Sequence, residues 1–165
     1  MQDRENRRAL AARAIQDEMR IENWCYGCGP LNPEGLQIKS YWEGDGAVCS
    51  YQPRLAFMAG PRHVLNGGII ATLIDCHSVC TAIAALYKAE QRPVGSDPVI
   101  WCVTGSIEIQ YLRPTPIAEP VVLRARIESI EGKRTTVECV LSSDGVERAR
   151  GRVVAVRVPP SWRAP

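Results

Sequence analysis

The sequence His63-Val-Leu-Asn66-Gly67-Gly68 runs directly into the segment Ile69–Tyr87, which is apolar on nearly every side of a helical projection. This pattern predicts a long helix that is buried on most of its sides. Asn66 is a favourable N-cap, because its side-chain oxygen can accept a hydrogen bond from a free N–H group of the first turn. The two glycines are poor helix formers, but they allow another group to approach the exposed backbone donors. We therefore expect a central helix with an accessible N-terminus.

Asp75 lies near the middle of this predicted helix, where a carboxylate is costly unless it is paired, hydrogen-bonded or next to a cleft. It belongs to a drifting polar line formed by Thr72, Asp75, Ser78 and Thr81. Asp75 and His77 also argue against a membrane-spanning helix. His77 points about 100° away from Asp75 around the helix, so we expect it to be a packing or interface residue.

Composition restricts the class of protein. The chain has 165 residues, 23% of them charged, and a net charge of +2, as in an ordinary soluble single domain. It has no basic-aromatic array typical of nucleic-acid binding and no signal-peptide pattern. Seven cysteines, an odd number, fit reduced thiols better than a disulfide framework. We expect a cytoplasmic protein with no nucleic-acid or membrane partner.

The chain divides into three predicted parts. Residues 1–22 form an N-terminal helical extension, with one apolar helical face between Arg4 and Arg20 that lies against the domain or a neighbour. Residues 23–160 form a single domain, and residues 161–165 form a tail.

The segment Trp24–Leu36 contains the pair Cys25-x-x-Cys28 within a run of turn-forming residues. A structural zinc site normally needs four ligands, and no second C-x-x-C or H-x-x-x-H follows. A redox C-x-x-C normally opens a helix, whereas Gly and Pro follow here. We therefore expect turn packing, with no metal ion and no cofactor, and keep a zinc or redox module as an alternative.

We predict two strands before the helix in the sequence and four strands after it. Before it we predict Leu36–Glu43 and Ala47–Gln52; after it we predict Trp101–Leu112, Pro120–Ile130, Arg134–Leu141 and Val146–Val158. In the third strand, simple alternation places Val103, Gly105, Ile107, Ile109 and Tyr111 on one face and Thr104 on the other. One buried helix against one antiparallel sheet is an α+β arrangement, and a partner subunit is a common cover for the remaining surface of the sheet.

Three segments carry a family resemblance. They are Cys25–Leu36, the turn Asn66-Gly67-Gly68 with Asp75 nine residues after Asn66, and Thr104–Pro114 with its Ile109-x-Tyr111-x-Arg113-Pro114 motif. In this order they resemble the hotdog-fold acyl-CoA thioesterases, in particular the phenylacetate-degradation type. The resemblance covers roughly residues 24–158.

The resemblance implies a hotdog fold, with a five- to six-stranded antiparallel sheet wrapped around the long helix. It implies a homodimer, often paired into a homotetramer, with active sites at the subunit interface and an acyl-CoA or acyl-carrier thioester as substrate. Asp75 would be the general base or nucleophile, and the backbone N–H of Gly67 or Gly68 would polarise the thioester carbonyl. Thr104 of the other subunit would position the attacking water.

Elementary chemistry agrees with this assignment. Thioester hydrolysis needs an activated water or carboxylate and a polarised carbonyl, and helix N-terminal N–H groups suit a developing oxyanion. Asp75 lies roughly 13 Å along the helix from Asn66 at ~1.5 Å per residue, too far for both to serve one carbonyl. A site assembled from two subunits removes this difficulty.

One position departs from the family pattern: Asn66 stands where the family usually has His. Asn66 is still a candidate catalytic residue, because Asn can donate a hydrogen bond, although it cannot carry a proton near neutral pH. Gly68 and His63 are candidate substrate-binding residues, and His63 could compensate for the missing histidine. Gly60 stands where some relatives have a polar helper. Two other functions therefore stay open: a hotdog hydratase or dehydratase, and a non-hydrolytic acyl-thioester binding protein.

Overall fold

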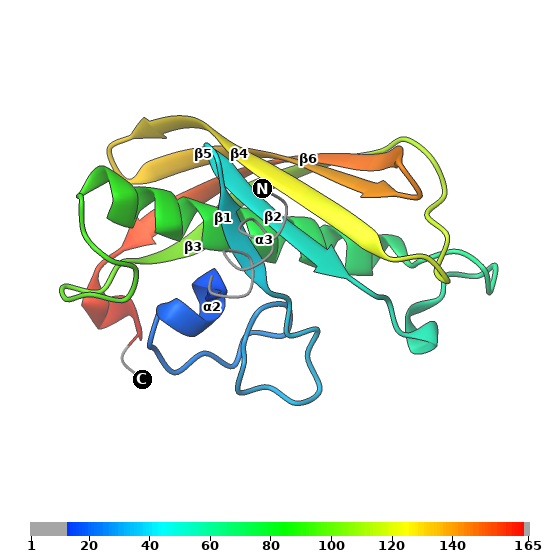
Figure 1. Cartoon of the computed structure of the whole chain (residues 1–165), viewed down its shortest axis with the longest axis horizontal. Coiled ribbons are helices and arrows are strands. Elements are labelled where there is room, and N and C mark those ends of the chain that lie inside the picture. The colour runs from blue at the N-terminus through cyan, green and yellow to red at the C-terminus, as the bar shows by residue number, and fades with distance from the viewer. Residues whose placement is uncertain (1–12, 164–165) are drawn as a thin grey trace, which may run out of the picture.

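A six-stranded antiparallel sheet curves over one long helix in the computed structural model, which describes residues 13–163 (Figure 1). The strands are β1 (Ser40–Glu43), β2 (Gly46–Tyr51), β3 (Trp101–Tyr111), β4 (Val121–Glu131), β5 (Arg134–Ser143) and β6 (Val146–Val158). Their order across the sheet is β1-β2-β4-β5-β6-β3, with every neighbouring pair antiparallel. This is the expected α+β hotdog architecture.

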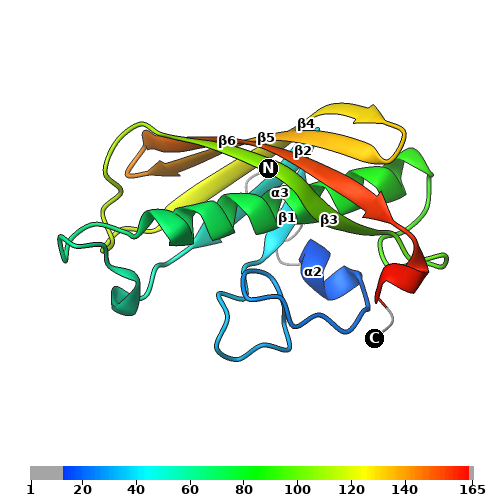
Figure 2. The ribbon, with the colours of Figure 1, turned by 180° about the vertical axis from the view of Figure 1, so that it is seen from behind.

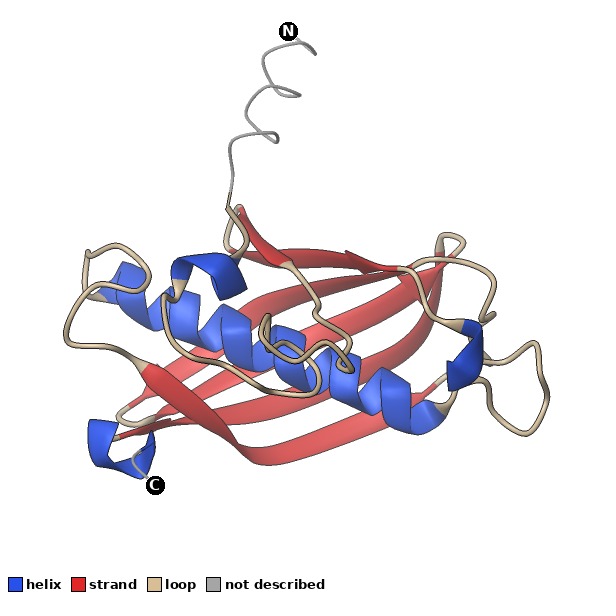
Figure 3. Cartoon of the chain, turned by 90° about the horizontal axis from the view of Figure 1, so that it is seen from below, coloured by secondary structure: helices blue, strands red, loops and turns tan. Residues whose placement is uncertain are grey.

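The central helix α3 (Gly67–Ala89) begins where the sequence predicts, with Asn66 as its N-cap. One side of the helix packs on the sheet, and loops cross its other side (Figure 3). By length and composition alone α3 could cross a membrane, but most of it is buried inside the domain. It is therefore the core helix of this domain, and Leu73, Ile74 and Ile83 are fully buried along it.

The first predicted strand is shorter than expected, because β1 begins only at Ser40. The backbone N–H groups of Leu36 and Ile38 donate instead to the carbonyls of Tyr26 and Gly27, at 2.7 and 3.1 Å. Gln37 between them has a φ of 50°, in the left-handed region, which breaks the extended conformation. The segment that was expected to extend β1 therefore holds the cysteine-containing loop in place.

The predicted N-terminal helix is also shorter within the described residues, where α2 covers only Ile15–Glu18. Arg20 has a φ of 51°, which is incompatible with continuing the helix. The earlier part of the prediction, residues 1–12, lies outside the described residues. Ile15 and Met19 are each only 2% exposed, so α2 contributes to the core. Two 3-10 helices, Leu55–Phe57 and Pro160–Arg163, complete the fold. The division of the chain into an extension (1–22), a domain (23–160) and a tail (161–165) stays a prediction.

A buried polar chain joins α2, β1 and α3. The ring of His77 lies 2.8 Å from Ser40 Oγ through Nδ1 and 3.2 Å from the Ala47 carbonyl through Nε2. Because a carbonyl only accepts, Nε2 carries the proton and Ser40 donates to Nδ1. Ser40 Oγ in turn accepts from Gln16 Nε2 at 2.9 Å. Burial lowers the pKa of His77 to about 4, so His77 is a neutral core residue at physiological pH.

Replacing Ser40 with Ala should lower the free energy of unfolding by about 1–3 kcal/mol, because it leaves buried polar groups of His77 and Gln16 without partners. Chemical denaturation would measure the change. Ser50→Ala, at an exposed position of β2, is the matched control and should change stability by less than ~0.5 kcal/mol. Equal stability of the two variants would contradict a structural role for the chain.

Candidate active site

The carboxylate of Asp75 projects from α3 toward the sheet edge, where Thr104 of β3 donates its hydroxyl hydrogen to Oδ1 at 2.6 Å. Burial raises the pKa of Asp75, and the hydrogen bond from Thr104 opposes this shift. Asp75 is half-buried while Thr104 is exposed, so the pair lies at the boundary between core and solvent. A carboxylate held in this way has one oxygen occupied and one oxygen available to take a proton from water.

A β-bulge at Gly105 places Thr104 against Asp75. The pairing of β3 with β6 shifts between Thr104 and Ser106, so Thr104 faces the helix together with Ile107 and Tyr111. The prediction that Thr104 lies on the opposite face from Ile107 and Tyr111 is therefore wrong, because one extra residue reverses the alternation. A Cβ on Gly105 would lie 2.7 Å from Val156 Cγ2, so any larger residue at the bulge would displace the side chain of Val156.

The Thr104 that bonds to Asp75 belongs to the same chain, whereas the expectation placed Thr104 of the other subunit at the attacking water. The reason is that β3 ends the sheet directly beside α3 (Figure 2). The carboxylate and its hydroxyl partner therefore form one preassembled half of the site.

The N-terminus of α3 forms a second group of candidate residues. Asn66 Oδ1 accepts the Gly68 N–H at 2.7 Å, which confirms the predicted cap. Among the described residues the Gly67 N–H has no hydrogen-bond acceptor, so it is the donor that remains for a ligand. Tyr111, at the far end of β3, donates to the Gly67 carbonyl at 2.8 Å and packs its ring over Gly67.

The structure does not bring all the predicted site residues together within one chain. Gly67 and Asp75 are eight residues apart on α3, which corresponds to about 12 Å at ~1.5 Å per residue. His63 is exposed in the turn before the helix, and its ring has no hydrogen-bond partner in the described part of the chain. The carboxylate half and the helix N-terminal half are therefore separate.

The surface around these groups is open. Strand β3 pairs only with β6 within residues 13–163, which leaves the other edge of an eleven-residue strand unpaired. Ile107 and Tyr111 on this strand are 38% and 56% exposed. A large hollow of about 1260 Å³ lies elsewhere, among charged residues of the sheet such as Arg126 and Arg152, and its lining includes none of the predicted site residues.

Two features escaped the sequence analysis. One is the Tyr111 hydroxyl, whose contact with Gly67 depends on the bulge at Gly105. The other is the pair Cys76 and Cys80, which lies next to Cys25 and Cys28. The available signal for the second was the spacing of four residues on a predicted helix, which places both thiols on one face.

Comparison with known proteins identifies the family of this chain. The family model of the thioesterase superfamily matches residues 63–149, which include α3 with Asp75 and the bulged strand with Thr104. A thioesterase superfamily protein from Shewanella loihica is 33% identical, and the alignment covers 74% of this chain and 91% of that chain with a TM-score of 0.59. The chain belongs to the thioesterase superfamily.

More distant relatives share the fold. The E. coli PaaI protein from the phenylacetic acid degradation operon has a TM-score of 0.61 at 14% identity, covering 75% of this chain and 81% of that one. Acyl-coenzyme A thioesterase THEM4 of Xenopus laevis is 27% identical over 99 residues, which is 58% of this chain and 37% of that protein. This chain therefore matches only a little over a third of the length of that curated relative.

Replacing Asn66 with Ala should lower the free energy of unfolding by about 1 kcal/mol, because the Gly68 N–H loses its cap. Asn66→Asp keeps an acceptor oxygen at the same place and should be as stable as the wild type. Urea denaturation would compare them, and an alanine variant as stable as the aspartate variant would show that the cap contributes nothing.

Proposed function

We propose that this protein hydrolyses acyl-CoA thioesters, with Asp75 as the general base. The observation that carries the proposal is the hydrogen bond of 2.6 Å from Thr104 to Asp75 Oδ1, which orients the carboxylate at a solvent-accessible boundary. Thr104 holds one oxygen, and the other oxygen is free to take a proton from a water molecule. The proposal uses the Gly67 N–H, with the positive end of the α3 dipole, to stabilise the oxyanion.

The reaction follows from these roles. Water attacks the thioester carbon while Asp75 takes one of its protons, and the carbonyl electrons move onto the oxygen that faces the Gly67 N–H. The tetrahedral intermediate collapses, the C–S bond breaks, and the coenzyme A thiolate leaves with the bonding pair. The proton held by Asp75 passes to the thiolate, so the products are a carboxylic acid and a thiol, and the carboxylate is regenerated.

The two halves of the site belong, in this proposal, to two chains of a homodimer. The unpaired edge of β3 offers backbone groups to a second copy of the same edge. Once the bulge at Gly105 is counted, Glu108 is the midpoint between Thr104 and Tyr111, because their β6 partners Ala155 and Ala149 are each three residues from Arg152, the partner of Glu108. A twofold axis at this midpoint brings Thr104 of one chain beside Tyr111 of the partner subunit, and Tyr111 touches Gly67. Asp75 of one chain then faces the helix N-terminus of the other.

The names of relatives support the substrate class. THEM4 proteins of Xenopus laevis, Rattus norvegicus and Mus musculus are named acyl-coenzyme A thioesterases, at 27–29% identity. A structural neighbour from Streptococcus mutans, with a TM-score of 0.59 at 15% identity, was solved bound to acetyl CoA. We propose an acyl-CoA rather than an acyl-carrier substrate on this basis.

A hydratase or dehydratase reaction fits the structure less well. Such a reaction on the same fold typically uses a carboxylate and a histidine at one substrate carbon. The chain has two histidines, and neither is hydrogen-bonded to Asp75. The ring of His77 is buried and bonded to Ser40 and Ala47, and His63 lies in the turn before the helix N-terminus.

Thiol release from short, medium, long-chain and aromatic acyl-CoAs would test the proposal and identify the acyl class. Asp75→Asn should lower kcat by about 10²–10⁴-fold, because it removes the base and keeps the size of the side chain. Gly67→Pro should lower kcat by about 10²–10³-fold, because proline fits the first helical position but lacks the N–H donor.

Gly67→Ala is the matched control, since it adds a Cβ at 3.4 Å from the Tyr111 ring but keeps the N–H. It should keep kcat within a few-fold of the wild type. Binding of acyl-CoA by the wild type without turnover would favour the non-hydrolytic binding protein. Undiminished turnover by folded Asp75→Asn would contradict the proposed base.

A further inference from the structure

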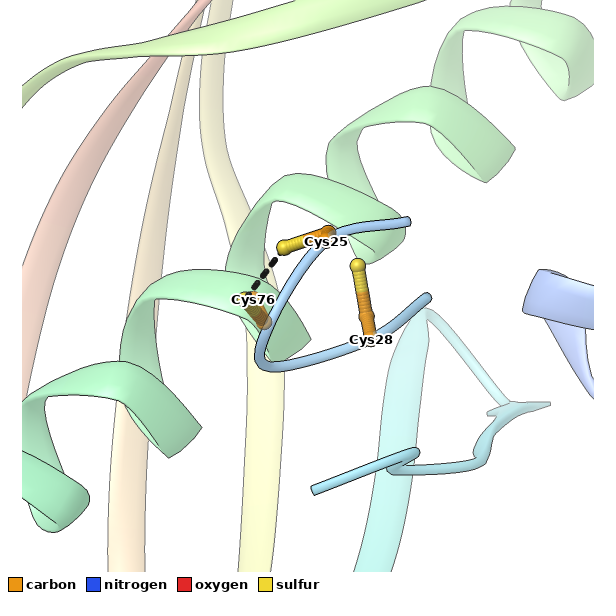
Figure 4. Close-up of side chains that lie close together, drawn as sticks. All are labelled: Cys25, Cys28 and Cys76. Carbon is orange, nitrogen blue, oxygen red and sulfur yellow. Dashed lines mark hydrogen bonds between the residues drawn. The ribbon is translucent and has the colours of Figure 1, made fainter. Parts of the chain in front are cut away.

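Three of the seven cysteines gather where a loop crosses α3, and a fourth lies one helical turn further along α3. The loop thiols Cys25 and Cys28 meet Cys76 of α3, and the three sulfur atoms lie within 4.8 Å of one another. Figure 4 shows the two loop cysteines where the loop crosses the helix, with Cys25 joined to Cys76. Cys80, one helical turn after Cys76, is buried on the same face of α3 and lies outside this group of three sulfur atoms.

The remaining cysteines behave differently. Cys49, Cys102 and Cys139 lie on separate strands of the sheet, and burial raises the pKa of each to about 11, 12 and 12 respectively. They are ordinary core thiols. The gathering of Cys25, Cys28 and Cys76 is therefore not a general property of cysteines in this fold.

We propose that Cys25, Cys28, Cys76 and Cys80 bind one Zn²⁺ ion through their thiolate sulfurs. Zinc in a structural site is tetrahedral with Zn–S bonds of ~2.3 Å, which places the sulfur atoms about 3.8 Å apart. The Sγ atoms of Cys25 and Cys76 are 3.6 Å apart, close to this value. Two ligands come from a C-x-x-C loop and two from positions i and i+4 of one helix face. Three of the sulfur atoms are already grouped, and the proposal requires Cys80 to turn toward them as the fourth ligand.

The loop is built to bring its thiols this close to the helix. A Cβ on Gly27 would lie 2.2 Å from Cys76 Sγ, so only glycine permits the approach. A Cβ on Gly29 would lie 2.4 Å from the backbone nitrogen of Cys25, which makes glycine necessary directly after the C-x-x-C pair. The Gly29 N–H closes the turn on the Cys25 carbonyl at 2.8 Å.

One hydrogen bond to sulfur favours the thiolate form that a metal requires. Asn23 Nδ2 donates to Cys28 Sγ at 3.7 Å. Donors of this kind orient metal ligands and tune their basicity. Cys25 lies at the surface and the other three thiols are buried, so the cluster has an entry path for an ion and a dry interior.

The bound ion would fasten the loop to α3 beside the catalytic carboxylate. Cys76 directly follows Asp75, and Cys25 and Cys28 lie in the segment that Leu36 and Ile38 anchor. Each thiol that binds releases its proton to solvent, and no electron transfer is involved. The site is separate from the Thr104–Asp75 pair and does not depend on the proposed hydrolysis.

Metal content is the direct test. Reduced full-length protein should retain one Zn²⁺ per chain by elemental analysis after removal of free metal. Co²⁺ in its place should give the thiolate charge-transfer and visible bands of a tetrahedral site. Cys25→Ser, at the surface, should weaken Zn²⁺ binding by more than ~100-fold, since even outer-shell changes cost about 10–100-fold. Zn²⁺ should raise the Tm of the wild type but not of this variant.

Matched controls separate the cluster from general effects. Cys102→Ala and Cys139→Ala remove buried thiols outside the cluster and should keep the full stoichiometry. Gly27→Ala should weaken Zn²⁺ binding, whereas Gly60→Ala, where a new Cβ meets nothing within 4 Å, should not. Cys80→Ala should change the Co²⁺ spectrum from four thiolates to three.

Three results would overturn the proposal. One is reduced, folded wild type that binds neither Zn²⁺ nor Co²⁺ stoichiometrically. Another is binding that survives in Cys25→Ser and in Cys76→Ala. The third is a Cys25–Cys76 disulfide formed under mild oxidation by protein that binds no metal when reduced, which would assign the cluster to redox chemistry.

Discussion

The burial of α3 is the constraint on which the rest of the structure depends. The helix is apolar on nearly every side, so the chain must cover all of it. The sheet covers one side, and the loops before β1 cross the other (Figure 3). A polar residue on such a helix needs a hydrogen-bond partner in the core or a position at the edge of the sheet. The His77 ring finds its partners in the core, in Ser40 and the Ala47 carbonyl. The Asp75 carboxylate instead lies at the sheet edge, where it accepts a hydrogen bond from Thr104.

The proposed chemistry depends on the edge strand of the sheet that covers α3. Because β3 is the last strand of the sheet, its bulge at Gly105 turns Thr104 toward α3 and leaves the pair at the solvent boundary. The same strand carries Tyr111 to the start of the helix, where it holds the Gly67 carbonyl. One edge strand thus touches both the carboxylate and the proposed oxyanion donor, which are about 12 Å apart along the helix.

Periodicity was sufficient to predict the central helix, its cap at Asn66, and most strand limits, because these features follow from local sequence. Periodicity was not sufficient to predict which face a side chain occupies where an extra residue shifts the pairing register of two strands. Simple alternation cannot reveal that Gly105 is a bulge, so it placed Thr104 on the wrong face. The shortening of β1 depends on backbone bonds to a distant loop, and the meeting of Cys76 with Cys25 depends on tertiary packing. Neither is encoded in a short window of sequence.

The central claim is that each active site takes Asp75 from one chain and Gly67 from the other. Subunit complementation tests it most directly: Asp75→Asn and Gly67→Pro chains, each inactive alone, are co-refolded and assayed for thiol release. Random mixing makes half of the dimers mixed, each with one intact site, so activity should recover to about a quarter of the wild-type value. If each chain carried a complete site, the mixture would be as inactive as its components, and that result would contradict the account.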